Sequence, residues 1–188
     1  MRWPTADSLM QTFHVDRQIE LTQDPDRCYF SNAPTLNAVN NIYGEGTSEE
    51  WLCYQIGNLS EFSGAKDKIG DNQLDEIAEL IRSDYGFLNM AEIMLFCRRF
   101  KKGQYDKFYG SVDPITIMRG LNEFCKERSY AYFMHEQKER ERIEAERSKQ
   151  SYLTYEEYEF IKYARLEYEM NTIEEDKMIE LKYGRHGK

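Results

Sequence analysis

The sequence is poor in the residues that build metal sites, disulfide frameworks and membrane spans. Four cysteines and three histidines are scattered over 188 residues. No two cysteines form the close pair that a zinc site or a redox motif needs. No apolar run approaches the roughly 20 residues of a membrane span, and the N-terminus has no apolar core for a signal peptide. These absences predict no metal site, no disulfides and a cytoplasmic protein.

Motifs for catalysis are missing as well. Neither a P-loop nor a dinucleotide-binding glycine pattern occurs, and Gly103, Gly110 and Gly120 do not form a phosphate loop. A metal triad or a histidine-activated nucleophile would need three histidines to converge from distant polar segments. Neighbouring carboxylates such as Glu156 and Glu157 fit a solvated helix face better than an acid–base pair. The sequence therefore predicts no catalytic residues, no cofactor and no small-molecule substrate.

Basic charge is scarce and concentrated in one part of the chain. The net charge of −9 argues against a protein that coats nucleic acid. Residues 82–128, with nine basic and six acidic residues, are the net basic part. Three interpretations of their basic, aromatic segment stay open: contact with nucleic acid, docking on an acidic protein surface, or cations at a helix C-terminus beside core aromatics. The candidate nucleic-acid-binding residues are Arg98, Arg99, Lys101, Lys102, Tyr105, Lys107 and Tyr109.

Helical periodicity and helix-capping signals are what the sequence has in abundance. Three successive helices are predicted between Asp71 and Arg128, each with apolar residues on one face. Their starts are capping residues or a proline at the first position, and their stops are glycines. The predicted helices run from Asp71 to Gly86, from Asn89 (with Glu92 completing a capping box) to Gly103, and from Asp113–Pro114 onwards.

The first 70 residues carry weaker signals. They predict a short helix near Pro4 and an irregular stretch over residues 14–30, which is polar and contains Pro25. Residues 31–42 predict a short helix with Pro34 near its first turn. Thr47 and Glu50 have capping-box spacing and predict a helix to about Phe62, with Gly64 as its stop.

Beyond Arg128 the third helix continues to Gln150 without proline or glycine. Its last part alternates acids and bases and has one large aliphatic residue, so we expect it to project into solvent. Thr154 and Glu157 begin another predicted helix, and a last one is expected from Ile173 to Tyr183. The apolar residues of the helix that begins at Thr154 are too aromatic for a solvated face, and we expect them to bind a partner: Tyr155, Tyr158, Ile161, Tyr163, Leu166 and Met170.

Together these patterns predict an all-α protein in three parts. A helical body occupies residues 1–134, a charged helical connector residues 135–150, and a tyrosine-rich helical arm residues 151–188.

The run from Leu88 to Arg128 resembles a segment of small helical proteins carried by bacterial phages and mobile elements. The shared pattern has a helix, a glycine–aromatic turn, an aromatic–Gly–x–Val–Asp step and a second helix. The matching residues are Leu88, Glu92, Ile93, Leu95, Phe96, Gly103, Tyr105, Phe108, Tyr109, Gly110, Val112, Asp113, Glu127 and Arg128. Some of those proteins resemble replication accessory or helicase-loading factors. The resemblance covers about 45 residues and implies a role of that kind.

Two functions follow as hypotheses. The first is a non-enzymatic accessory factor of DNA replication or of a mobile element, acting through protein contacts with DNA nearby. The second is a structural or assembly protein that oligomerises through its C-terminal arm. Binding of DNA, and a smaller assembly when the arm is removed, distinguish the two.

Overall fold

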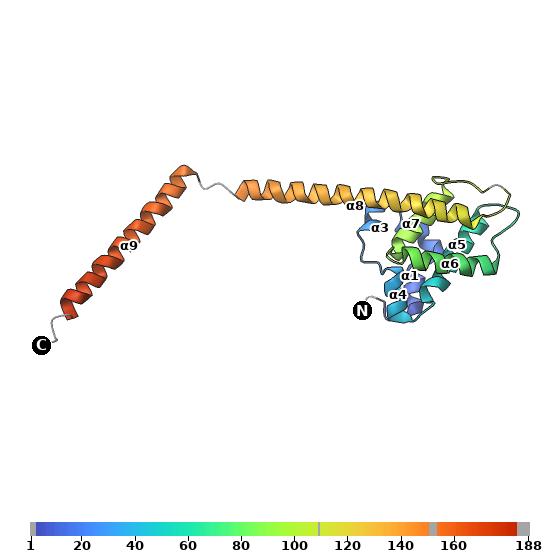
Figure 1. Cartoon of the computed structure of the whole chain (residues 1–188), viewed down its shortest axis with the longest axis horizontal. Helices are drawn as coiled ribbons and strands as arrows, with labels where there is room; N and C mark the ends of the chain where they lie inside the picture. The colour runs from blue at the N-terminus through green and yellow to red at the C-terminus, as the bar shows by residue number, and fades with distance from the viewer. Residues whose placement is uncertain (1–2, 109, 151–153, 184–188) are drawn as a thin grey trace. The chain divides into compact units, whose positions relative to one another are not determined.

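The structure is a computed structural model that describes residues 3–108, 110–150 and 154–183. The predicted all-α class is confirmed: these residues contain helices and two isolated bridges but no strand. The chain divides into two compact units, Met1–Glu136 and Gln137–Lys188, and helix α8 belongs to both. The helices, labelled in Figure 1, are α1 Ala6–Thr12, η1 Val15–Arg17, α2 Gln18–Leu21, α3 Pro25–Tyr29, α4 Leu36–Tyr43, α5 Thr47–Phe62, α6 Asp71–Tyr85, α7 Met90–Lys101, α8 Pro114–Gln150 and α9 Tyr155–Tyr183.

Helix α7 is the centre of the first unit. Every residue from Met90 to Cys97 is buried, and so is Phe100. A helix that is apolar on all sides has to be surrounded, and α2, α3 and α5 all pack on α7. The sequence had predicted a single apolar stripe, so the burial of Leu95 and Phe96 corrects that picture.

The predicted caps at Asn89 and Asp113 are confirmed. Asn89 Oδ1 accepts a hydrogen bond from the Glu92 N–H at 2.9 Å, and Glu92 Oε2 accepts one from the Asn89 N–H at 2.8 Å. Asp113 Oδ1 accepts from the Ile115 N–H at 2.9 Å, and α8 then begins at Pro114 and runs unbroken to Gln150. Side chains that satisfy the orphan amides of a first turn therefore fix where these helices begin.

The two predicted boundaries of α6, Asp71 and Gly86, do not have the predicted cap geometry. Asp71 is the first residue of α6 and Gly70 is its cap, with the Gly70 N–H donating to Gln73 Oε1 at 3.2 Å. Gly86 does not end α6 in a left-handed conformation, since its φ is −58°. A Cβ at Gly86 would lie 2.2 Å from Asn37 Oδ1. This glycine is therefore required by the close approach of α4.

The start of α5 also differs from its prediction. Thr47 forms no capping box, because the cap residue is Gly46 with a φ of 86°. The orphan amide of Ser48 donates instead to Asn40 Oδ1, 2.8 Å away on α4. Helix α4 itself begins at Leu36, so Pro34 precedes the helix and does not lie in its first turn.

The prediction that residues 14–30 are irregular is wrong. They form η1, α2 and α3, each of three to five residues. Pro25 occupies the first turn of α3, and Asp24 Oδ1 accepts from the Asp26 N–H at 3.0 Å. The signal is the same Asp–Pro pair that begins α8. Helices this short give no readable periodicity, which is why the stretch looked unstructured.

The second unit contains the end of α8 and the helix α9. The predicted capping box is confirmed: the Thr154 N–H donates to Glu157 Oε2 at 2.8 Å, and the Glu157 N–H donates to Thr154 Oγ1 at 3.3 Å. The separate last helix from Ile173 is a correction, because α9 is continuous to Tyr183. The predicted stop, Gly184, lies outside the described residues, and the three-part division of the chain stays a prediction. Among the described helices, none is both long and apolar enough to cross a membrane.

Candidate functional site

Three of the five predicted nucleic-acid-binding cations are engaged inside the first unit. Arg98 donates to the carbonyl of Thr22, and Arg99 donates to the Tyr29 hydroxyl at 2.7 Å. Lys101 Nζ donates to Gln18 Oε1 at 2.8 Å, and burial lowers the pKa of this ammonium group. These side chains join α7 to the short helices of residues 15–29. These three partners lie 70 or more residues away in sequence. Arg99 also donates to Glu127, and Lys101 to Asn58, which lie 28 and 43 residues away, so no local pattern could have shown any of these contacts.

The remaining predicted residues divide into exposed, half-buried and undescribed ones. Lys102 and Lys107 are exposed. Tyr105 is half-buried, with its ring 5.6 Å from that of Phe96. Tyr109 lies outside the described residues. The prediction of a nucleic-acid contact here remains a prediction, and it now depends on Lys102 and Lys107.

A small hollow lies beside these two lysines, between the end of α5 and the connection that follows α7. Its volume is about 320 Å³. Phe62 and Phe108 line it together with Lys101, Lys102 and Lys107. Phe62 is 63% exposed, and Lys101 Nζ lies 5.6 Å from the centre of its ring. Exposed aromatic rings beside ammonium groups have the chemistry that stacks on a nucleobase and contacts its phosphate.

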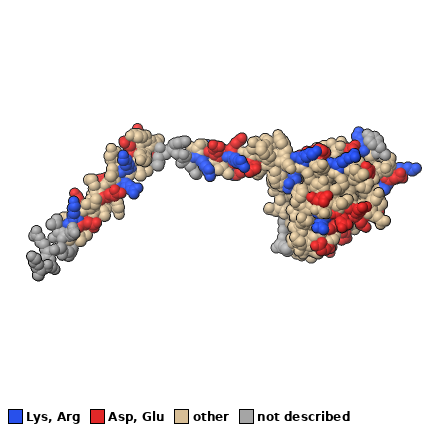
Figure 2. All heavy atoms as spheres, viewed as in Figure 1, with Lys and Arg blue, Asp and Glu red and all other residues tan. Residues whose placement is uncertain are grey.

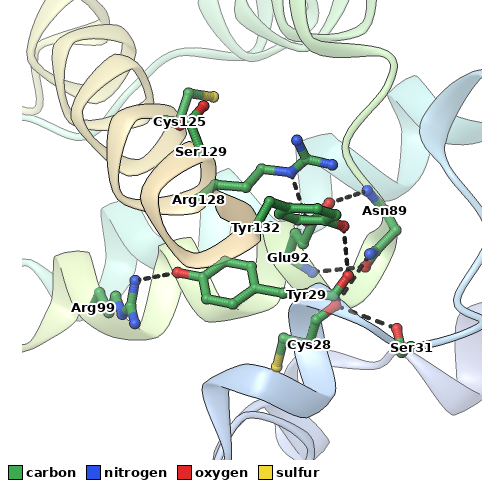
Figure 3. A network of polar contacts seen from close by, with 10 residues as sticks. All are labelled: Cys28, Tyr29, Ser31, Asn89, Glu92, Arg99, Cys125, Arg128, Ser129 and Tyr132. Carbon is green, nitrogen blue, oxygen red and sulfur yellow. Dashed lines mark hydrogen bonds and ion pairs between the residues drawn. The ribbon is translucent and has the colours of Figure 1, made fainter. Parts of the chain in front are cut away.

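A polar network, drawn in Figure 3, joins α3, α7 and α8 inside the first unit. Glu92 is fully buried, and its Oε1 accepts from Arg128 Nε at 2.6 Å. The Tyr132 hydroxyl donates to the carbonyl of Tyr29 at 2.6 Å. Burial raises the pKa of the Glu92 carboxyl, although the Asn89 N–H and the Arg128 guanidinium oppose that rise.

The buried polar atoms of this network are satisfied within the protein. The described residues contain no buried side-chain nitrogen or oxygen without a hydrogen-bond partner. The Arg128 guanidinium also lies 4.3 Å from the centre of the Tyr132 ring, a cation–π contact that adds to the ion pair. The network therefore fastens α8 to α3 and to the start of α7. The sequence predicted Glu92 as a capping residue and Arg128 as a residue of the third helix. It contained no sign that the two side chains form an ion pair.

A second, larger hollow was missed by the sequence analysis. It lies between α5 and α6, has a volume of about 1000 Å³, and has Cys53, Tyr54 and Leu74 among its apolar lining. Its carboxylates are Glu45, Glu49, Glu50, Asp75 and Glu79. Figure 2 shows acidic residues gathered on the first unit in this view. The sequence signal here is that residues 1–81 carry 14 acidic and 5 basic residues, which does not locate a hollow.

In this hollow, the surroundings of Glu49 and Cys53 shift the pKa of each side chain in a definite direction. Glu49 lies 3.0 Å from Arg82 Nε and accepts from Asn40 Nδ2 at 2.7 Å. Burial acts to raise the pKa of Glu49, but these bonds outweigh it and hold the pKa below its ordinary value. Burial raises the pKa of the Cys53 thiol to about 11, so little thiolate is present at neutral pH for nucleophilic attack. No group of three or more potential metal ligands occurs among the described residues.

The predicted partner-binding residues all lie on α9, and all are exposed. Their exposed fractions run from 46% at Leu166 to 75% at Tyr155. Five more large apolar side chains of α9 are exposed as well: Phe160, Tyr168, Ile173, Met178 and Ile179. Helix geometry does not place the six predicted residues on one face. Tyr163, Leu166 and Met170 share a face, and Ile161 lies on the opposite side.

Comparison with known proteins places the chain in a family. No curated protein and no solved structure matches it. A family model described as a family of unknown function, DUF6633, matches residues 68–171. The match spans α6, α7, the basic connection, α8 and the first half of α9. Because it covers more than half of the 188 residues, the chain belongs to the DUF6633 family.

Proposed function

We propose that this protein acts by binding another protein through α9. The observation that carries the proposal is the exposure of eleven large apolar side chains along that helix, each at least 46% exposed. Soluble monomers rarely leave an apolar surface of this extent uncovered, and such surfaces commonly mark interaction sites. An isolated helix is also marginal in water, because most helical stability in proteins comes from packing.

The biological setting is proposed from the resemblance to phage and mobile-element proteins. We propose a non-enzymatic accessory factor of DNA replication or of a mobile element, in the cytoplasm. The family match includes the resembling segment, Leu88 to Arg128, and extends into α9. In this setting α9 binds a partner protein, and the first unit supplies a stable base held by the network around Glu92.

Site-specific photo-crosslinking in the native host tests this proposal. A benzophenone amino acid replaces Tyr163 on α9 or, as the control, Tyr130 on α8. These tyrosines have matched exposures of 63% and 66%, so random collisions should label both equally. We expect a discrete crosslinked protein from position 163 and none from position 130. Equal labelling, or no adduct from position 163, would contradict the proposal.

Contact with single-stranded nucleic acid at the small basic hollow is a second candidate function. The exposed Phe62 ring beside Lys102 and Lys107 supports it. Replacing both lysines with Ala should weaken binding in a gel shift and reduce its salt dependence by about two ionic contacts. The Lys66→Ala and Lys138→Ala double variant is the control, because both lysines are exposed and lie outside the hollow. Equal weakening by the two pairs would argue against a site at the hollow.

A further inference from the structure

The apolar side chains of α9 include one unbroken ribbon. Tyr163, Leu166, Met170 and Ile173 follow one another at intervals of three, four and three residues. This is the a/d spacing of a two-helix coiled coil. All four are exposed, from 46% at Leu166 to 65% at Met170. The ribbon is short, since its ten residue steps of about 1.5 Å give about 15 Å.

Charged residues limit the ribbon at both ends. The next a/d position before Tyr163 is Glu159, and the next after Ile173 is Lys177. A charge at these positions opposes burial against an apolar partner. The contact therefore covers about three helical turns.

The residues that flank the ribbon are mostly acidic. In the register that puts Tyr163 at position a, the e positions are Glu167 and Glu174. The g positions are Lys162, Glu169 and Asp176. All five residues are exposed in α9, and Arg165 Nε lies 3.2 Å from the Glu169 carboxylate, on the outer face. Charges at e and g positions select the partner of a coiled-coil helix.

We propose that the α9 ribbon docks an amphipathic helix of a different protein, one whose own apolar ribbon is flanked by lysine or arginine. This inference rests on the proposed function and adds the chemistry of the partner. Four of the five flanking residues are carboxylates, so a basic-flanked helix meets opposite charges on both sides of the seam. Oppositely charged flanks attract the right helix and reject the wrong one.

A second copy of α9 matches the charges of this surface less well than a basic-flanked helix does. In a parallel pair, position g of one helix faces position e of the next heptad on the other. That geometry joins Lys162 to Glu167 favourably, but it sets Glu169 against Glu174. In an antiparallel pair, e faces e and g faces g, so the e positions bring carboxylate against carboxylate and only Lys162 among the g positions supplies a positive charge. Self-pairing at neutral pH therefore gains no net attraction from these flanks, whereas a basic-flanked helix meets opposite charges at four of the five positions.

Two synthetic helices with matched cores test the partner chemistry. Both are about 28 residues, or four heptads, with Ile at a and Leu at d; one has Lys at every e and g position and the other has Glu. Each is titrated against the full-length protein at neutral pH and low salt. We expect the Lys-flanked peptide to bind about tenfold more tightly or better, and added salt to reduce the difference. Equal binding, or tighter binding of the Glu-flanked peptide, would overturn the inference.

Two adjacent residues of α9 provide a matched control for register. Glu174 is at position e, beside the ribbon, and Glu175 is at position f, on the outer face. Glu174→Lys should weaken binding of the Lys-flanked peptide about threefold or more, the size of an exposed ion pair. Glu175→Lys makes the same change in net charge and should leave binding within experimental error. Equal weakening by the two variants would show long-range attraction without a docked seam and overturn the inference.

The outcome also separates this inference from the proposed function. If position 163 crosslinks a protein in the host while the full-length protein shows no preference for the Lys-flanked peptide, the inference fails and the proposed function stands. If the full-length protein forms a dimer at neutral pH that Leu166→Glu abolishes, the occupant is a second copy and the inference also fails. Selective binding of the Lys-flanked peptide by a monomeric chain supports it.

Discussion

At the scale of single residues, the first unit is organised by polar side chains that meet partners far away in sequence. Arg128 and Glu92 are 36 residues apart and form an ion pair in which Glu92 is fully buried. A buried carboxylate is costly unless it is paired, and its loss of a partner is more damaging than the pair is stabilising. This ion pair holds α8 against α7, so breaking it should lower the free energy of unfolding.

Arg128→Met should lower the free energy of unfolding by about 2–3 kcal/mol. This is below the full cost of breaking a buried pair, because the Arg128 side chain is 21% exposed. Urea denaturation measures the change. Adding Glu92→Gln to Arg128→Met removes the unpaired charge and should recover part of the loss. A double variant that is less stable than Arg128→Met alone would contradict this explanation.

Replacing glycine with alanine should have opposite effects on stability at two positions. A Cβ on Gly120 of α8 would lie 2.8 Å from Phe100 Cε2 within the buried core, so Gly120→Ala should destabilise by about 1–2 kcal/mol. A Cβ on Gly57 of α5 would meet only Leu74 Cδ1 at 3.9 Å. Gly57→Ala should therefore stabilise the helix by about 0.5–1 kcal/mol. Thermal denaturation measures both. Stabilisation by both substitutions would show that the packing around Gly120 is looser than described, and destabilisation by both would contradict the free space beside Gly57.

The lowered pKa of Glu49 should make the stability of the folded protein depend on pH. Its pKa in the folded protein is held below the ordinary value despite burial, through bonds from Asn40, Ser48 and Arg82. A lowered folded pKa contributes stability above the unfolded pKa, and this is lost as pH falls through the folded pKa. Glu49→Gln should therefore give a shallower fall in melting temperature across the acidic range. An unchanged slope would remove Glu49 from the acid sensitivity.

At the scale of helices, loss of the N-terminal cap should destabilise the first unit when the helix is α8 but not when it is α9. Asp113→Ala removes the acceptor for the Ile115 N–H and should destabilise the first unit by about 1 kcal/mol, because α8 packs there. Thr154→Ala removes the Thr154 hydroxyl that accepts from the Glu157 N–H. It should reduce the helical circular dichroism signal and leave the main unfolding transition unchanged. A lower melting temperature for Thr154→Ala would show that α9 contributes to the stability of the first unit.

The same helices show how far the sequence could predict the structure. Local signals gave the starts of α7, α8 and α9, because each cap lies within three residues of the amide that it satisfies. The start of α5 could not be predicted from local signals, since the Ser48 N–H donates to Asn40 on another helix. The basic segment can be read directly from the sequence, but the inward engagement of Arg98, Arg99 and Lys101 depends on distant partners that a linear pattern does not contain.

At the scale of the whole molecule, the first unit carries the stability of the fold and α9, as we propose, carries the recognition of a partner. The first unit has a continuous buried core built around α7, whereas the large apolar side chains of α9 are exposed. Deleting residues 151–188 should therefore leave the unfolding temperature of the remaining chain unchanged and abolish partner binding. A large drop in the unfolding temperature after the deletion would show that α9 is part of the folded core.

Hydrogen exchange of the full-length protein by itself, at neutral pH and at two protein concentrations, tests the central claim most directly. If α9 awaits a partner, its amides should exchange rapidly and at the same rate at both concentrations, because an unpacked helix opens readily. The amides of α7 should exchange slowly, since their opening requires unfolding of the core. Protection of α9 comparable to that of α7 would contradict the account. Protection at both concentrations would mean packing within the chain, and protection only at the higher one would mean self-association.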